Sequence, residues 1–555
     1  MLAACMLTLA ACATSTNPSA TPGNGNPARS DRATAAPAGN PNPFAADDRS
    51  EWSKLAIAPY TPSTEAIGDE RDIADKRVSH GLVPIPSLSR YATQVLAKLK
   101  AASGIRNVPG KVLIVANDQL DAGSTPDGNI FVSLGYFRSL DNEDQLAALL
   151  AHELSHVLLH HHDSNWFSRQ QKQFMSWFED AAVIKNLFDT VMDGIDNRSG
   201  NKPKTASSKT VKTQAAAKPV VPKASTAARP GLPASTGPNT QDALLTPKQR
   251  EALDRMNLLV KLNDRALTPA WGRRQESQAD RLAADLMMRA NYSVADGILP
   301  WLAKVAEWDA WQEKVRAELA EKRKQAIETL ASAGQFDASV RTAIDGAMKD
   351  LFEQVGQSHD DGQKRLDDET DYLMRVYGDK LGNQKATVAP YQAVMKQGEV
   401  KAMLDGYHEA FVARTQILDQ QYAQAAPALR KLTEGGRATS NHALPNFLLF
   451  EAERGLNGSP ARLEPSLQRS LGASEPTWEP FESAIDWYGA RKRTSTIPEL
   501  GRRALARFND APSAYPRLIA LYVRYGFMDE ANKVDSDCRR KQAAMRSACD
   551  KALKP

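Results

Sequence analysis

Long hydrophobic runs, cysteine and a strong net charge are all scarce in this sequence of 555 residues. No stretch beyond the N-terminus reaches the about eighteen apolar residues that a transmembrane helix needs, so no membrane-spanning helix is predicted. The formal net charge of +4 predicts no domain-wide basic face, and nucleic acid is therefore not expected as a partner. The hydrophobic fraction of 42% suffices for packed cores, and the length predicts two or three domains.

Two of the four cysteines lie in a short apolar stretch at the N-terminus. The segment from Leu9 to Cys12 resembles the lipobox of bacterial lipoproteins, in which the signal peptide is cleaved before an acylated cysteine. Residues 1–12 are therefore predicted to be a lipoprotein signal peptide, truncated at its N-terminus because the usual positive region is missing. Cys12 would anchor the protein without spanning the bilayer. Ala13 in place of an aspartate favours the periplasmic side of the outer membrane; the alternative is a soluble protein with an apolar N-terminus.

The other two cysteines, Cys538 and Cys549, are an even pair near the C-terminus. In an oxidising periplasm such a pair is typical of a disulfide. One straight helix would hold the two residues roughly 16 Å apart, which is too far for a bond. A disulfide therefore requires a turn between residues 543 and 547.

Composition divides the chain into four predicted parts. Residues 13–48 are rich in Ala, Pro, Asn and Gly, as in a disordered tether. Residues 49–385 would form the first folded domain, interrupted by the basic insert 197–240, which has neither an aromatic nor an acidic residue. The insert is either a solvated linker or a basic arm for anionic polymers. Residues 386–555 alternate helix-length segments with short turns, which predicts an all-α region of helical repeats.

The first folded domain is predicted to combine helices with a small sheet. The segment Ser89–Lys100 has helical periodicity, and Lys111–Ala116 and Asn129–Val132 have the pattern of strands. A strong helix follows, with Asp141 as its expected N-cap and a buried face of leucines. The predicted fold is thus mainly α, with an α+β first domain.

His152-Glu153-Leu154-Ser155-His156 is an HExxH sequence inside this strong helix. Residues i and i+4 share one helix face, so both imidazoles can reach one metal ion while Glu153 stands beside them as the base. A catalytic zinc takes three protein ligands and keeps one position open. Glu276 is the predicted third ligand, and Asp280, one turn later, would orient a histidine ligand. The alternative is a helix with buried, hydrogen-bonded histidines.

Three further histidines follow this motif, at positions 160, 161 and 162. His160 lies one turn beyond His156, so a second metal site is conceivable. The other interpretation, and the favoured one, is that these residues cap the helix C-terminus, where positive charge is stabilised.

These motifs together resemble the M48 family of gluzincin metallopeptidases, especially periplasmic members with a C-terminal tetratricopeptide-repeat (TPR) domain. The resemblance rests on residues 89–91, the segment 121–132, the helix 143–161 and the sequence Glu276–Asp280. It implies a zincin-like domain over residues 49–385 and one Zn²⁺ per chain. A TPR-like helical domain would occupy residues 386–555.

The resemblance also suggests roles for residues outside the zinc motif. The segment from Ser358 implies that His359 lies near the zinc as an oxyanion donor or plug, and that Arg365 pairs with carboxylates around the site. An extended substrate is expected to add a strand to a sheet edge formed by Asn129, Ile130, Phe131 and Val132.

The predicted function is zinc-dependent endopeptidase activity in the periplasm. The expected substrates are unfolded or misassembled envelope proteins, and the TPR-like region would select them or dock on outer-membrane assembly machinery. Two alternatives remain: a catalytically silent chaperone or assembly scaffold, and a hydrolase of peptidoglycan peptides.

Overall fold

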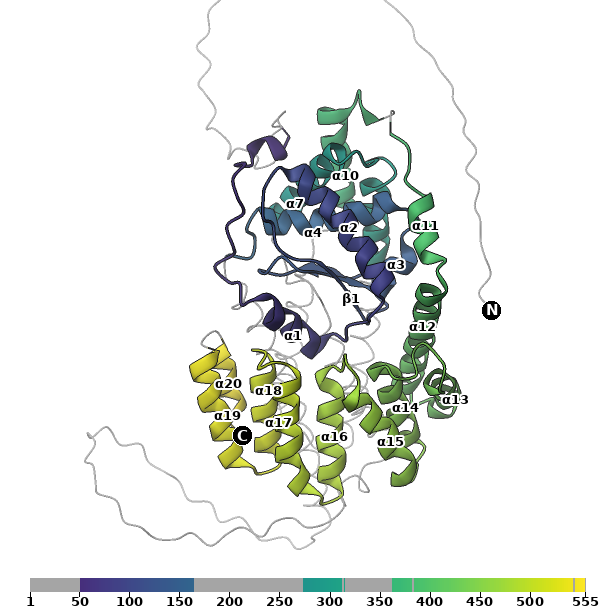
Figure 1. Cartoon of the computed structure of the whole chain (residues 1–555), viewed down its shortest axis with the longest axis vertical. Helices are drawn as coiled ribbons and strands as arrows, with labels where there is room; N and C mark the ends of the chain where they lie inside the picture. The colour runs from purple at the N-terminus through teal and green to yellow at the C-terminus, as the bar shows by residue number, and fades with distance from the viewer. Residues whose placement is uncertain are drawn as a thin grey trace, which may run out of the picture. The chain divides into compact units, whose positions relative to one another are not determined.

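The computed structural model describes residues 50–163, 273–311, 314, 362–381, 384–542 and 545–554. Within them the chain is mainly helical with one small sheet (Figure 1), which confirms the predicted fold class. The predicted signal peptide with Cys12, the tether 13–48, the insert 197–240 and His359 lie outside the described residues. None of the described helices is both long and apolar enough to cross a membrane.

The sheet has three strands: β1 (Val112–Val115), β2 (Ala122–Ser124) and β3 (Ile130–Ser133). Their order is β1-β3-β2, with β1 parallel and β2 antiparallel to β3. A turn between β2 and β3 contains Gly128 at φ +79°, a left-handed conformation that glycine adopts without strain.

The expectation that Asn129–Val132 forms an exposed edge is wrong. β3 is the central strand, hydrogen-bonded on both sides and buried throughout, so it has no free edge for a substrate. β2 takes the edge position instead. The short sequence Ala122-Gly123-Ser124 contains no β-branched or aromatic residue, and strand propensity therefore gives no sign of it.

Three helices form the core of this domain: α2 (Pro86–Ser103) and α4 (Glu143–Leu158) cover one face of the sheet, and α7 (Arg273–Arg289) packs on both of them. Alternate strand residues, such as Val112 and Ile130, point into this core. The N-cap of α4 is Asn142, one residue beyond the expected Asp141, and its side chain accepts a hydrogen bond from Gln145 N at 2.8 Å. Around the core lie α3 (Leu134–Ser139) and α10 (Gly362–Tyr377).

Helix α1 (Asp69–Ser79) lies between the sheet and the C-terminal helices (Figure 1). Ile73 packs against the opposite face of the sheet, with Phe131 and Val115. Ala74 and Val78, by contrast, belong to the core of the C-terminal helices. One helix thus contributes to both hydrophobic cores.

The C-terminal region consists of consecutive helices in which each packs on the next along the chain. Glycines permit two of the close approaches: a Cβ on Gly455 would lie 2.5 Å from the Tyr422 ring, and one on Gly489 would lie 2.3 Å from Tyr525. The TPR assignment of this region stays a prediction. The elements are α11 (Ala389–Met395), α12 (Gly398–Leu418), α13 (Tyr422–Thr433), α14 (Ala443–Gly455), α15 (Pro460–Gly472), α16 (Trp478–Ala490), α17 (Ile497–Arg507), α18 (Ala514–Arg524), α19 (Met528–Lys541) and α20 (Arg546–Ala552).

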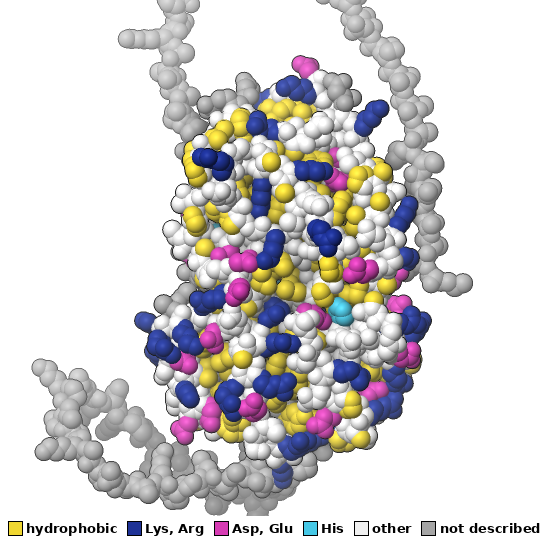
Figure 2. Space-filling view, in the orientation of Figure 1, with side chains coloured by type: hydrophobic (Ala, Val, Ile, Leu, Met, Phe, Trp, Pro, Cys, Tyr) yellow, Lys and Arg dark blue, Asp and Glu magenta, His cyan; other side chains and the backbone are white. Residues whose placement is uncertain are grey.

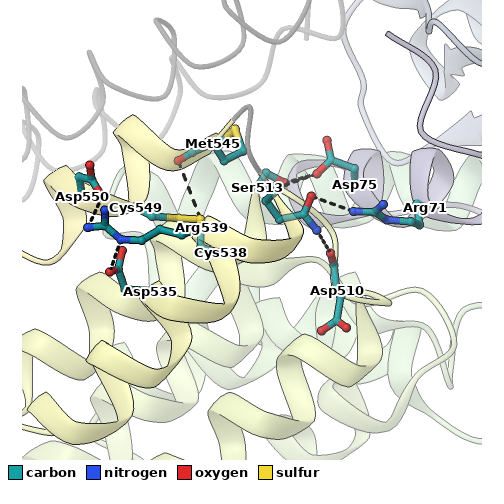
Figure 3. Close-up of a disulfide and its surroundings, with 11 residues drawn as sticks. Arg71, Asp75, Asp510, Ser513, Asp535, Cys538, Arg539, Met545, Cys549 and Asp550 are labelled. Atoms are coloured by element: carbon teal, nitrogen blue, oxygen red, sulfur yellow. Dashed lines mark hydrogen bonds and ion pairs between the residues drawn. A yellow bond between two sulfur atoms is a disulfide. The ribbon is translucent and has the colours of Figure 1, made fainter. Parts of the chain in front are cut away.

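Cys538 and Cys549 form a disulfide with a Cα–Cα distance of 6.6 Å (Figure 3). The bond is possible because α19 ends at Lys541 and α20 starts at Arg546, so the chain folds back between the two cysteines. The break between the two helices overlaps the interval 543–547 in which a turn was predicted, and residues 543 and 544 are outside the described part.

Candidate metal centre

Two packed helices bring the HExxH motif and the downstream carboxylate together. α4 presents His152, Glu153 and His156, all buried, and α7 packs along it and presents Glu276, which is 1% exposed. More than a hundred positions of sequence separate the two helices, and only this packing makes them neighbours. The structure thus assembles the three predicted metal ligands in one place.

The spacing of the ligand atoms fits a single ion. The Nε2 atoms of His152 and His156 lie 3.2 Å apart, and they lie 3.6 and 3.8 Å from the two carboxylate oxygens of Glu276. Tetrahedral zinc with bonds of about 2.0–2.1 Å sets its ligands about 3.4 Å apart. In addition, Glu276 Oε1 is buried and makes no hydrogen bond to another described residue. A buried carboxylate oxygen without a donor is a position that a cation would satisfy.

Behind the ligands, Asp280 and Arg365 form a buried charged layer. Asp280 Oδ1 lies 2.8 Å from Nδ1 of His152, which directs the other ring nitrogen of that histidine toward the site. Arg365, from α10, donates to both oxygens of Asp280 at 2.7 and 2.9 Å and lies 3.1 Å from Glu276 Oε2. The guanidinium thereby holds the two carboxylates of α7 in fixed orientations.

The charges around the two histidines differ. Burial lowers the pKa of His156, and the neighbouring His152 and His161 lower it further, so His156 is neutral as a metal ligand must be. Burial also acts to lower the pKa of His152, but the hydrogen bond to Asp280 and the charges of Asp280 and Glu276 raise it overall. Burial likewise acts to raise the pKa of Asp280, yet Arg365 and His152 hold it well below its usual range.

Glu153 lies beside the ligand cluster and also contacts the edge strand β2. Burial raises the pKa of its carboxyl group, while the charge of His152 and hydrogen bonds from the hydroxyl and backbone N–H of Ser124 oppose that rise. Because Thr125 N bonds to Asn129 O across the β2–β3 pair, the peptide groups of Ser124 point away from β3. The outer edge of β2 therefore runs beside the predicted base.

Two of the three trailing histidines contact the site, which sequence reasoning missed. His161 Nδ1 lies 2.9 Å from His156 Nδ1, and His162 Nε2 lies 3.2 Å from the carbonyl oxygen of Ser124. His160, at φ +51°, instead stacks on Tyr60 with ring centroids 5.4 Å apart. The hypothesis of simple helix caps was therefore incomplete, because the chain turns back after α4 and points two rings inward.

Trp301 is a further neighbour of the site without any sequence signal. Its ring centroid lies 5.2 Å from that of His152, and Arg365 approaches the same ring at 5.9 Å. It belongs to the helical segment 298–311. A buried aromatic ring here excludes water from one side of His152, which strengthens the electrostatic interactions of the site.

An HExxH helix joined by a carboxylate from a second helix is typical of zinc metallopeptidases, and comparison with known proteins agrees. The sequence model of Peptidase family M48 matches residues 86–227. The β-barrel assembly-enhancing protease of Escherichia coli (strain K12) is 30% identical over 120 residues, which cover 21% of this chain and 25% of that protein. The protein of the same name from Yersinia pestis is 31% identical over 105 residues, covering 19% and 22%.

Residues 86–227 thus match the M48 peptidase family, and this part of the chain is similar to part of the β-barrel assembly-enhancing proteases. The match spans about a quarter of the length of those relatives. Glu276, the third residue of the candidate metal-ligand cluster, lies C-terminal to the segment that the family model matches.

Proposed function

We propose that the protein is a zinc-dependent endopeptidase of the periplasm that degrades misfolded or misassembled envelope proteins, including outer-membrane proteins. The observation that carries the proposal is the convergence of His152, His156 and Glu276 with a base, Glu153, beside them. The name of these relatives, β-barrel assembly-enhancing protease, supports both the proposed activity and the proposed class of substrate.

The proposed mechanism divides the work between the two helices. His152, His156 and Glu276 would hold Zn²⁺, which when bound supplies a Lewis acid that makes water a nucleophile near neutral pH. Glu153 accepts the proton of the attacking water and then delivers it to the leaving amine. Arg365 and Asp280 keep the ligands oriented throughout. His359 stays a candidate for the oxyanion donor.

The substrate strand is proposed to add to β2 instead of β3. β2 is the edge strand of the described sheet, and Ser124 within it contacts Glu153 and His162, contacts that a bound substrate strand would replace. An extended peptide needs backbone partners, and pairing with a strand edge reads the backbone more than the side chains. This mode of binding suits an enzyme that accepts unfolded polypeptides of varied sequence.

The matched variants Glu153→Gln and Glu409→Gln test the assignment of the base. Glu153→Gln should keep its zinc, measured by elemental analysis, and lose at least about 10²-fold in casein cleavage, because proton transfer to a positioned side chain contributes that much or more. Glu409 is exposed on α12, remote from the motif in sequence, so Glu409→Gln should cleave like the wild type. Full casein cleavage by Glu153→Gln would refute the mechanism.

The wild type and the Glu153→Gln variant also distinguish the proposed function from two alternatives. A scaffold without catalysis needs neither three ligands nor a base, and it would show no Glu153-dependent cleavage of any polypeptide. A peptidoglycan hydrolase would release soluble fragments from purified cell wall, again only with Glu153 intact. We therefore expect casein cleavage and no fragment release.

Lipid anchoring through Cys12 is proposed as well. Labelling with a radioactive fatty acid would test it, and the label should be absent from Cys12→Ala.

A further inference from the structure

A cavity of about 340 Å³ lies between the peptidase domain and the C-terminal helices, away from the metal ligands. The loop that follows β1 contributes residues 116–119, and helix α12 contributes Tyr407, Phe411 and Arg414. The loop before α16 adds Glu475 and the start of that helix adds Glu479. The sequence offered no sign of this cavity, because its walls come from segments hundreds of residues apart.

The walls are rich in aromatic rings. Trp308 and Trp311 stack with ring centroids 4.6 Å apart, and Trp311 is 49% exposed. Tyr407 and Phe411 are buried neighbours on α12, with ring centroids 6.1 Å apart. Exposed tryptophan faces attract cations through the ring quadrupole.

The charged side chains of the lining are mainly acidic. Asp118, Glu475 and Glu479 face one cation, Arg414, which lies 3.2 Å from Glu479. His442, 3.3 Å from Glu475, does not offset this charge, because burial lowers the pKa of His442 against the opposing charge of Glu475 and leaves the imidazole neutral. His80 is the histidine of the lining itself. The Glu475 carboxylate is instead held by the backbone N–H of Ala443 at 3.1 Å. An aromatic cavity with surplus carboxylates is complementary to an organic cation.

We propose that this cavity binds a lysine or arginine side chain of an extended polypeptide, with the charge near Glu475 and Glu479 and the aliphatic stem against the tryptophans. That this polypeptide is a substrate rests on the proposed function. Binding of the side chain in the cavity does not itself require cleavage. Trp301, which contacts His152, and Trp308 lie on the same helical segment 298–311, roughly 10 Å apart along its axis. A strand covers that distance in about three residues, so the cavity would select a basic residue near the cleaved bond.

The test measures binding with the full-length protein carrying Glu153→Gln, loaded with zinc, and a fluorescent disordered peptide that contains one central lysine. Acetylation of that lysine, Trp311→Ala and Glu479→Gln should each weaken binding about tenfold, because each removes one part of the cation site. Binding should also weaken as salt is added. Val412→Ala and Glu409→Gln are matched controls on exposed positions of α12 outside the lining, and they should bind like the parent.

Equal affinity for the lysine and acetyl-lysine peptides overturns the proposal, and so does unchanged binding by Trp311→Ala and Glu479→Gln. Circular dichroism melting curves of each variant identify any loss of fold; Trp311 and Glu479 are at least partly exposed, so the variants should melt like the parent. The outcome is separable from the proposed function. Loss of lysine-dependent binding with intact Glu153-dependent cleavage rejects the cavity alone, and the reverse result rejects the peptidase mechanism alone.

Discussion

His161 shows how one side chain behind the proposed metal ligands can set their chemistry. To bind zinc through Nε2, a neutral His156 must carry its proton on Nδ1. Nδ1 of His156 lies 2.9 Å from Nδ1 of His161, so His156 would donate this hydrogen bond and His161 would accept it. His161 is 7% exposed, so water does not readily replace it as the acceptor. The pair therefore fixes both the tautomer and the ring plane of the ligand.

We expect His161→Ala to weaken zinc binding by about 10- to 100-fold, the usual effect of removing a group that orients a ligand. Competition with a chromophoric chelator measures the zinc dissociation constant without reference to activity. His160→Ala is the matched control, since His160 is stacked on Tyr60 outside the ligand contacts, and its affinity should stay close to that of the wild type. An unchanged dissociation constant for His161→Ala would show that His156 needs no such partner.

At the scale of elements, helix α1 is tied to the β2–β3 hairpin by a buried carboxylate. Asp72 accepts hydrogen bonds from the Thr125 hydroxyl at 2.7 Å and from the Asn129 amide at 2.8 Å. Burial raises the pKa of Asp72 to about 7, although these two hydrogen bonds oppose the shift. The hairpin carries the edge strand, so α1 positions β2 through this contact.

The raised pKa predicts a pH-dependent stability. Between about pH 4 and pH 7 the folded protein keeps a proton on Asp72 that the unfolded chain has released, so the contribution of Asp72 to folding falls as the pH rises through this range. Asp72→Asn keeps an acceptor oxygen and removes the charge. The melting temperature of Asp72→Asn minus that of the wild type should therefore be several degrees greater at pH 8 than at pH 5.

Thermal melts at both pH values make this comparison, with Asp419→Asn, an exposed position at the end of α12, as the control. The control should show no pH-dependent difference from the wild type. A constant difference between Asp72→Asn and the wild type at the two pH values would mean that Asp72 is ionised in the folded protein throughout.

Prediction from sequence succeeded for elements whose stability is local and failed for those defined by pairing. The helix of His152 was recognisable because its apolar period, its cap region and its acidic first turn all agree. The strand at Val112–Val115 was recognisable from its β-branched residues. The central position of β3 was not recognisable from the sequence, because the order of strands in a sheet depends on which segments pair. The strand that pairs with β3 on its outer side contains Gly123, which gives no local signal for a strand.

At the scale of the whole molecule, contacts from α1 join the peptidase domain to the far C-terminal helices. Asp75 accepts hydrogen bonds from the backbone N–H and hydroxyl of Ser513 at 2.9 and 2.8 Å, and Arg71 donates to Gln542 at 2.8 Å (Figure 3). These partners lie close to the disulfide of α19 and α20. Over the C-terminal helices basic and acidic side chains are interspersed on the face in Figure 2, so no surface of one charge develops there.

The disulfide between Cys538 and Cys549 should stabilise this C-terminal end. Closing a loop with a sequence separation of 11 is worth about 3 kcal/mol in the chain-entropy account. The double variant Cys538→Ser/Cys549→Ser should therefore lose about that much free energy of local unfolding for α19 and α20. Amide hydrogen exchange on these two helices measures it.

Helix α4 is the internal reference in the same exchange experiment. Its protection should be unchanged, because the peptidase core does not include the cysteines. Equal exchange of α19 and α20 in the variant and the wild type would show that packing alone holds the C-terminal end.

The sequence by itself determined the chemistry of this protein: which helix carries two imidazoles and a carboxylate on one side, which residue types can bind a divalent ion, and which segments are helical. Those properties follow from the helical period and the side chains, which act over a few residues. Only the tertiary structure decided that Glu276 reaches that helix, that β2 is the edge strand, that His161 contacts His156 and that a cavity opens between the domains. Each of these depends on packing between segments distant in sequence, and no local pattern records which surfaces meet.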